Sequence, residues 1–323
     1  MSSVPATERL SGGRRVRDRL GDRLLLFLTL AASVAAVVVM GAIVYKVLES
    51  SHRAFSKFGI SFLWGTVWDA NPAKNLFGAG TFIYGTAVTS LIALIIAVPL
   101  AIAIALFLSE LAPRGIRGVV GSLVETLAAI PSVVLGLWGI LVMGPFVANH
   151  VEPSLHSWFG FLPIFSGKPG SSGVFIAGLV LAIMVVPIVA SICRELFLSV
   201  PNELEEGALA LGATRWEMVK GVILHSSRPG IAAAVILGLG RAIGEAIAVT
   251  QVIGAATAIH VSLFDPGDTL ASRIAGQYQG AVSNVQISAL FYLAAILLVI
   301  GLLTNLLAQM IVRRFDVHGA GAR

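Results

Sequence analysis

The chain has 323 residues, of which 57% are hydrophobic and only 12% are charged, and its mean hydropathy is +0.91. So little polar surface excludes a soluble globular protein and predicts an integral membrane protein. The net charge of +5 arises from basic residues distributed over the tails and loops that flank the apolar runs, whereas a nucleic-acid-binding protein would cluster its basic residues on one soluble face.

Six apolar runs each reach the roughly 20 residues that a membrane-spanning helix needs. They lie at 24–47, 84–108, 119–147, 174–197, 231–256 and 287–312. The runs predict an all-α, polytopic membrane protein with six transmembrane helices. Pro99, Pro131 and Pro187 lie inside the second, third and fourth runs. We expect each to kink its helix, because proline lacks the backbone N–H donor.

Most lysine and arginine residues lie in the tail before residue 24, in two of the loops and after residue 312. Because positively charged loops stay on the cytoplasmic side, both termini and the loop 202–228 are predicted to be cytoplasmic. The domain organisation expected is a cytoplasmic tail at 1–23, a membrane domain at 24–312 and a second cytoplasmic tail at 313–323.

The external segment 48–82 is rich in aromatic residues. It contains Phe55, Phe58, Phe62, Trp64, Trp68 and Phe77. Such residues favour the membrane interface, so an interfacial helix is the preferred interpretation. A binding surface for an external partner is the alternative.

The third run combines Glu125 near its cytoplasmic end with Gly136 and Gly139 beyond Pro131. Glu125 is interpreted as a hydrated carboxylate at the N-terminus of the helix. The two glycines are expected to let a neighbouring helix approach closely.

Two external loops carry acidic or histidine residues without an adequate set of metal ligands. His150, Glu152 and His156 are spaced like metal ligands, but no further ligand completes a set nearby, so we predict a solvated loop and no metal site. Asp265 and Asp268 flank a Pro-Gly pair, which predicts a turn.

The charged loop 202–228 has two helix-start patterns. Asn202 precedes Glu205 by three residues, as Thr214 precedes Glu217, and such pairs can cap helices. Gly212 is suited to the left-handed turn between them. The pattern predicts two short amphipathic helices that dock on a partner, with a solvated connecting loop as the alternative.

This loop resembles the EAA coupling loop of ABC importer permeases. The residues that follow the spacing of this loop are Glu206, Gly207, Ala208, Gly212, Val222 and Leu224. Two positions depart in residue type, with Gly207 in place of the usual Ala and His225 in place of the usual Pro. The resemblance implies a partner ATPase subunit. The residues expected to contact it are Glu205, Glu206, Gly207, Ala208, Gly212, Thr214 and Arg215.

The fifth run contains Arg241 near the membrane midplane and Glu245 one helical turn further along. An unpaired charge there costs at least about 2.5 kcal/mol, so the two are expected to pair within the helix. They either lock the helix to a neighbour or line a path, and we favour the path. Because Arg is a permanent cation that matches oxyanions, an anion is the expected passenger. Thr250 and Gln251 are candidates for further hydrogen bonds along it.

Gly238, Gly240 and Gly244 precede or flank this pair. Their spacing does not fit a dinucleotide-binding fingerprint. They are expected to serve close helix packing, with Gly240 and Gly244 as a small-xxx-small pair.

The runs 241–254 and 129–139 resemble the corresponding helices of phosphate ABC-transporter permeases. The long first external segment is more similar to the PstC-type subunit than to the PstA type. This resemblance implies uptake of inorganic phosphate across the bacterial plasma membrane. It also implies a sister permease subunit, two copies of an ATPase subunit that binds ATP and Mg²⁺, and an extracytoplasmic phosphate-binding protein. No cofactor and no catalytic residue are expected in this chain.

Four alternatives remain at this point. The first is that the chain is a PstA-type subunit, and the second is that it is a permease for another oxyanion such as sulfate or molybdate. An ion-coupled secondary carrier would need no ATPase and leaves the coupling loop unexplained. A membrane-embedded enzyme would need a nucleophile with a base, or a metal cluster, inside the bilayer.

Overall fold

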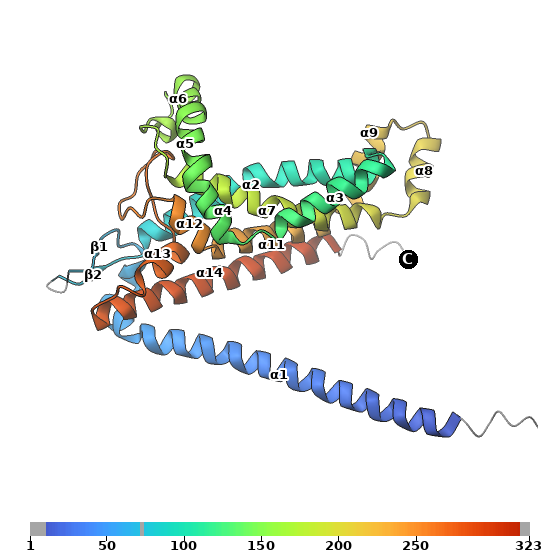
Figure 1. Ribbon diagram of the computed structural model, residues 1–323, viewed down its shortest axis with the longest axis horizontal. Helices are drawn as coiled ribbons and strands as arrows, with labels where there is room; N and C mark the ends of the chain where they lie inside the picture. The colour runs from blue at the N-terminus through green and yellow to red at the C-terminus, as the bar shows by residue number, and fades with distance from the viewer. Residues whose placement is uncertain (1–10, 72–73, 317–323) are drawn as a thin grey trace, which may run out of the picture. The chain divides into compact units, whose positions relative to one another are not determined.

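The structure is a computed structural model that describes residues 11–71 and 74–316. Within this described part, five helices are long and apolar enough to cross a membrane, and one bent helix pair makes a possible sixth. This confirms the all-α, polytopic fold (Figure 1). The predicted tails lie partly outside the described residues, at 1–10 and 317–323.

The first run belongs to one continuous helix, α1 (Ser11–Phe58). The helix begins well before the predicted start at residue 24, because residues 11–23 include no proline and arginine is a good helix former. The chain divides into two compact units, Met1–Ser50 and Ser51–Arg323. All further contacts described here lie within the second unit.

After the end of α1, the aromatic segment 48–82 forms a 3₁₀ turn, η1 (Gly59–Leu63), and a small antiparallel hairpin of β1 (Trp68–Asp69) and β2 (Leu76–Phe77). Its rings are partly internal: Phe62, for example, is buried and stacks on Tyr292 at 4.4 Å between ring centroids. Beyond Phe58, where α1 ends, the predicted interfacial helix is therefore wrong, because the chain forms a turn and a hairpin there. Stacked and edge-to-face aromatic pairs are stabilising beyond the area they bury, which accounts for the packing of these rings on one another.

Two long helices form the centre of the second unit, α2 (Gly80–Leu106) and α7 (Val174–Leu198). Alanines at every fourth position of α2 share one buried face and allow the helices to approach closely. They are Ala93, Ala97, Ala101 and Ala105. Pro99 and Pro187 lie inside these two helices, as predicted.

The third run is divided where one helix was expected. α3 (Arg114–Ala128) ends before Pro131, and α4 (Ser132–Trp138) begins after it. Pro131 is extended (ψ 136°), so it separates two helices instead of kinking one. The chain then continues helically through π turns, α5 (Gly144–Phe146) and α6 (Glu152–Phe159) to a 3₁₀ turn, η5 (Pro163–Phe165). The candidate span is therefore Ser132–Phe159.

The end of α3 also corrects the interpretation of Glu125. This residue lies in the last turns of α3, not at a helix N-terminus. Its Oε1 is 3.8 Å from Nη1 of Arg194 on α7. The carboxylate is 65% exposed, so the pair contributes little to stability.

The loop 202–228 contains α8 (Asn202–Ala210), α9 (Arg215–Met218), a π turn and α10 (Leu224–Ser226). A bend of 68° leads from its last helical part into α11 (Arg228–Gly244). Next come α12 (Ile247–Val252), α13 (Leu270–Gln277) and α14 (Asn284–Asp316). The fifth run is thus broken between α11 and α12, where a single helix was predicted.

Candidate functional site

Arg241 and Glu245 meet at the break between α11 and α12. Arg241 Nη2 lies 3.3 Å from Glu245 Oε2. The arginine side chain is 46% exposed, whereas the glutamate side chain is 5% exposed. The pair therefore forms as predicted, with its cation accessible and its anion enclosed.

The conformation of Glu245 explains why the helix stops there. Its backbone is extended (φ −73°, ψ 115°), and its Oε1 accepts a hydrogen bond from the Ala248 N–H at 3.1 Å. The carboxylate thus satisfies a first-turn N–H of α12, where a negative charge is favoured. One side chain both pairs with Arg241 and starts the next helix.

A groove of about 880 Å³ opens beside Arg241, between α7, α11 and α14. Gly240 and Gly244 line it, and a Cβ atom at either position would meet no atom within 4 Å. Within the described chain, neither glycine therefore serves the close helix packing that was predicted for it. Gly238 does pack closely, because a Cβ there would lie 2.8 Å from Val185 on α7.

Thr250 and Gln251 make their contacts outside this groove. The Thr250 hydroxyl donates to the Ala246 carbonyl at 2.7 Å and to the Ser272 carbonyl at 3.4 Å. Gln251 lies against Gly136 of α4, and its Oε1 is buried without a partner in the described chain. Neither residue lines the groove, so a place for them in the path stays a proposal.

The glycines of the third run do allow close approach. A Cβ at Gly136 would lie 2.9 Å from the Ala248 backbone, and one at Gly139 would lie 2.9 Å from Val252. The prediction of a tight helix contact is confirmed, and the neighbour is α12. This contact fixes the short helix that Glu245 caps.

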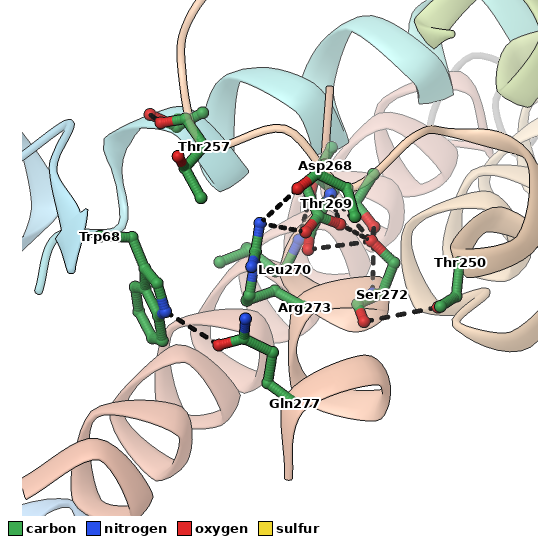
Figure 2. A network of polar contacts seen from close by, with 12 residues as sticks. Trp68, Thr250, Thr257, Asp268, Thr269, Leu270, Ser272, Arg273 and Gln277 are labelled. Atoms are coloured by element: carbon green, nitrogen blue, oxygen red, sulfur yellow. Dashed lines mark hydrogen bonds and ion pairs between the residues drawn. The ribbon is translucent and has the colours of Figure 1, made fainter. Parts of the chain in front are cut away.

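A second ion pair, which sequence interpretation missed, lies at the other end of α12 (Figure 2). Arg273 Nη2 is 2.7 Å from Asp268 Oδ2, and both side chains are 4% exposed. Arg273 also donates to the Ala255 carbonyl at 3.1 Å, and its guanidinium lies 4.7 Å from the centroid of the Phe82 ring. Ala255 has a positive φ of 55°, so this bond holds a conformation that alanine rarely adopts.

Neighbouring hydrogen bonds extend the pair into a network across four elements. Thr269 and Ser272 form a reciprocal cap at the start of α13. The Leu270 N–H donates to Thr86 on α2 at 3.0 Å, and Trp68 of β1 donates to Gln277 at 2.9 Å. The turn predicted around Asp268 is therefore a buried junction. The sequence did hold a signal for this junction, namely an Asp and an Arg five residues apart on either side of a Thr-x-x-Ser cap.

The loop at 202–228 shows one of its two predicted caps. The Thr214 N–H donates to Glu217 Oε2 at 2.8 Å, and the Glu217 N–H donates to Thr214 Oγ1 at 3.3 Å. Gly212 has the expected left-handed φ of 88°. The Asn202 cap is wrong, because α8 already includes Asn202 and Pro201 precedes it without a side-chain bond.

The apolar residues of this loop divide between the core and the surface. Met218 and Ile223 are buried, whereas Leu204, Leu211 and Trp216 are exposed. Burial raises the pKa of the half-buried Glu205, and the charges of Glu110 and Glu206 raise it further. The loop therefore presents exposed apolar side chains among acidic ones.

The residues considered as metal ligands are dispersed. Glu152, predicted to lie in a solvated loop, is fully buried at the start of α6 and accepts a hydrogen bond from the Gly170 N–H at 2.9 Å. His156 Nδ1 is 2.8 Å from the Phe165 carbonyl. Over the described ranges, no three His, Cys, Asp or Glu side chains gather to hold a metal ion.

The chain is similar in sequence to known transport proteins. Residues 97–317 match the family described as binding-protein-dependent transport system inner membrane component. Phosphate transport system permease protein PstC of Pasteurella multocida is 44% identical over 283 residues, covering 86% of this chain and 88% of that protein. PstC of Xylella fastidiosa (strain 9a5c) is 39% identical over 317 residues, covering 97% of each chain.

The chain therefore belongs to the binding-protein-dependent inner membrane transport components and, within them, to the family of the PstC permeases. It is a multi-pass transport component. Its fold is also that of a bacterial ABC transporter involved in the import of the acidic polysaccharide alginate, with a TM-score of 0.58 and 20% identity. That similarity covers 92% of this chain and 99% of the other.

Proposed function

We propose that this chain is the membrane-spanning permease subunit of an ATP-driven importer that moves inorganic phosphate across the bacterial cytoplasmic membrane. The observation that carries the proposal is the half-exposed Arg241 beside a groove between membrane helices. The choice of phosphate as the substrate is based on the PstC relatives, which are named as phosphate transport system permeases. Sulfate, molybdate and a PstA-type role are thereby less favoured.

The unequal burial of Arg241 and Glu245 suits a site that binds and then releases an oxyanion. Glu245 is held in place by the Ala248 N–H, so the flexible partner is the arginine. Its planar guanidinium can leave the carboxylate and donate two parallel hydrogen bonds to phosphate oxygens. When phosphate departs, Glu245 is the replacement anion, and competition between the two anions keeps phosphate from binding too tightly to leave.

Coupling to ATP is assigned to the α8–α9 loop. Its exposed Leu204, Leu211 and Trp216 offer apolar area to a cytoplasmic ATPase subunit, and Gly212 sets the angle between the two helices. The contact residues proposed are Glu205, Glu206, Gly207, Ala208, Gly212, Thr214 and Arg215. ATP and Mg²⁺ are bound and ATP is hydrolysed by two copies of that separate subunit, so this chain itself needs no cofactor.

The remaining partners follow from the same assignment. A sister permease subunit supplies the other half of the path, and an extracytoplasmic phosphate-binding protein delivers the substrate. Both termini are proposed to be cytoplasmic, which agrees with the lysine and arginine content of the loops. The external face then carries the hairpin and the α12–α13 junction.

The test is uptake of labelled phosphate into vesicles that contain this chain with its sister subunit, the ATPase and the binding protein. We expect uptake to require ATP and to persist in excess sulfate. Inhibition by sulfate or molybdate would change the passenger. Uptake driven by an ion gradient without the ATPase would overturn the coupling assignment.

A further inference from the structure

The groove beside Arg241 extends along α11 and α14, which run in opposite directions (Figure 1). Its residues on α11 begin at Ala233, near the helix start, and end at Gly244. Its residues on α14 run from Leu297 to Gln309. The groove therefore leads from the Arg241 level toward the end of the helices where the α8–α9 loop lies.

The α14 wall of this groove has an unexpected chemistry. Thr304, Asn305 and Gln309 line it, although they belong to an apolar candidate span, Asn284–Met310. The Thr304 hydroxyl is satisfied by the Gly301 carbonyl at 2.9 Å. The amides of Asn305 and Gln309 have no hydrogen-bond partner within the described part of the chain. An amide facing hydrocarbon without a partner is costly, so this wall indicates a polar occupant.

Glycines widen the groove beside Arg241, which suits a mobile occupant. Gly240 and Gly244 on α11 and Gly301 on α14 line it, and a Cβ at any of the three would meet no atom within 4 Å. Glycine in a helix interior costs stability relative to alanine. Here it is not compensated by close packing, so the open space itself is the feature that the three glycines provide.

We propose that Asn305 and Gln309 form a second oxyanion contact, on the cytoplasmic side of Arg241, through which phosphate leaves the site. The inference rests on the proposed function and adds α14 to the path. An amide NH₂ group donates hydrogen bonds to an oxyanion but carries no charge. The anion thus passes from a charged donor to neutral donors, which bind it more weakly and let it move on.

Two other occupants would give the groove a different meaning. Lipid acyl chains would fill an apolar groove, but they leave the two amides unsatisfied. A helix of the sister subunit would satisfy the amides and exclude water. The groove is instead filled with water, and it attracts anions because Arg241 lines it.

Thiol labelling of the assembled complex in inside-out vesicles tests whether the groove is filled with water and attracts anions. The native Cys193 is fully buried, so a single introduced cysteine can be labelled selectively. The variants are Asn305→Cys and, as a matched control, Leu306→Cys, because Leu306 is the next residue and does not line the groove. Each is treated with a small anionic (sulfonate) and a small cationic methanethiosulfonate reagent.

We expect the Asn305→Cys variant to react with the anionic reagent, and added phosphate to slow that reaction. Adding Arg241→Gln should slow it roughly fivefold, the effect of one nearby charge in a hydrated site. The Leu306→Cys control should show neither dependence. No reaction at position 305 with either reagent would mean that lipid or the sister subunit fills the groove. Reaction that ignores both phosphate and Arg241 would mean a wet groove that is not an anion path.

These readouts do not depend on phosphate uptake, so the inference can fail while the proposed function stands. As a second measurement, Asn305→Leu should lower the initial rate of phosphate uptake several-fold in a complex that still assembles and hydrolyses ATP. Asn305→Asp should lower it further, because a carboxylate repels the passing anion. Full uptake by the Asn305→Asp variant would overturn the inference.

Discussion

Glu245 holds Arg241 with one carboxylate oxygen, at 3.3 Å, and the first turn of α12 with the other, at 3.1 Å. The proposed substrate site and the break in the membrane helix therefore depend on the same side chain. Substitutions of Arg241 and of Glu245 should have separable effects, because only Arg241 lines the groove.

Arg241→Gln should reduce phosphate uptake while the complex still assembles. Loss of a charge-assisted hydrogen bond of about 2 kcal/mol corresponds to a decrease of roughly 30-fold. Arg241→Lys keeps the charge without the planar guanidinium, so its uptake rate should lie between those of the unsubstituted chain and the Arg241→Gln variant. Initial uptake rates at saturating ATP measure the effect, and undiminished uptake by the Gln variant would remove Arg241 from the path.

Glu245→Gln and Glu245→Ala should differ in stability but share a transport defect. The Gln side chain still accepts from the Ala248 N–H, whereas Ala loses this cap at a cost of about 1 kcal/mol. Both leave Arg241 without its carboxylate, so phosphate should be released more slowly in both. Thermal unfolding and single-turnover release separate the two effects, and equal melting temperatures would argue against the cap.

Arg273→Met should destabilise the protein by about 3–5 kcal/mol, because it leaves Asp268 buried without its cation. The double variant Arg273→Met with Asp268→Leu should recover part of this loss. The exposed pair of Lys74 and Asp69, at 3.3 Å, supplies a control, since Lys74→Met should cost less than about 1 kcal/mol. Thermal unfolding measures all three, and similar effects at both sites would contradict a structural role for the buried pair.

Gly212→Ala should uncouple ATP hydrolysis from transport. The residue has a φ of 88°, and a Cβ in the left-handed region costs about 1–2 kcal/mol, which would change the angle between α8 and α9. Gly221→Ala is the matched control, because that glycine lies in the same loop and an added Cβ meets nothing within 4 Å. The ratio of ATP hydrolysed to phosphate imported is the measurement, and a normal ratio in the Gly212 variant would count against docking there.

Glu205→Gln should stabilise the protein in a pH-dependent way. Burial and the charges of Glu110 and Glu206 raise the pKa of Glu205 in the folded state, so its ionised form opposes folding. The penalty is absent below the ordinary pKa of glutamate, near 4.3, and grows as the pH rises through the folded-state value. The melting temperature should therefore increase at pH 7 and stay unchanged near pH 4. The same increase at both pH values would contradict an electrostatic origin.

Interactions between residues close in sequence were predictable because helix geometry alone brings them together. The Thr214–Glu217 cap and the Arg241–Glu245 pair span three and four residues. The same reasoning failed where a local competitor intervened. With Pro201 as the residue before the helix, α8 starts at Asn202 itself, and the Glu245 cap divided a run that hydrophobicity alone showed as continuous.

Interactions between distant residues were not predictable. The partner of the Leu270 N–H is Thr86, 184 residues away, and the buried position of Asp268 and Arg273 follows from such contacts. The glycines show the same limit, because Gly238 packs on α7 while Gly240 opens onto the groove. Nothing in their spacing distinguishes the two.

The sequence by itself determined the membrane class, the number of apolar runs, the Thr214–Glu217 cap and the proximity of Arg241 to Glu245. These follow from composition and from the repeat of one helix. Only the tertiary structure decided which helix faces surround the arginine and which buried charges hold the short helix beside it. The reason is physical: a side chain's environment is set by the elements that pack against it, and those elements come from distant parts of the chain.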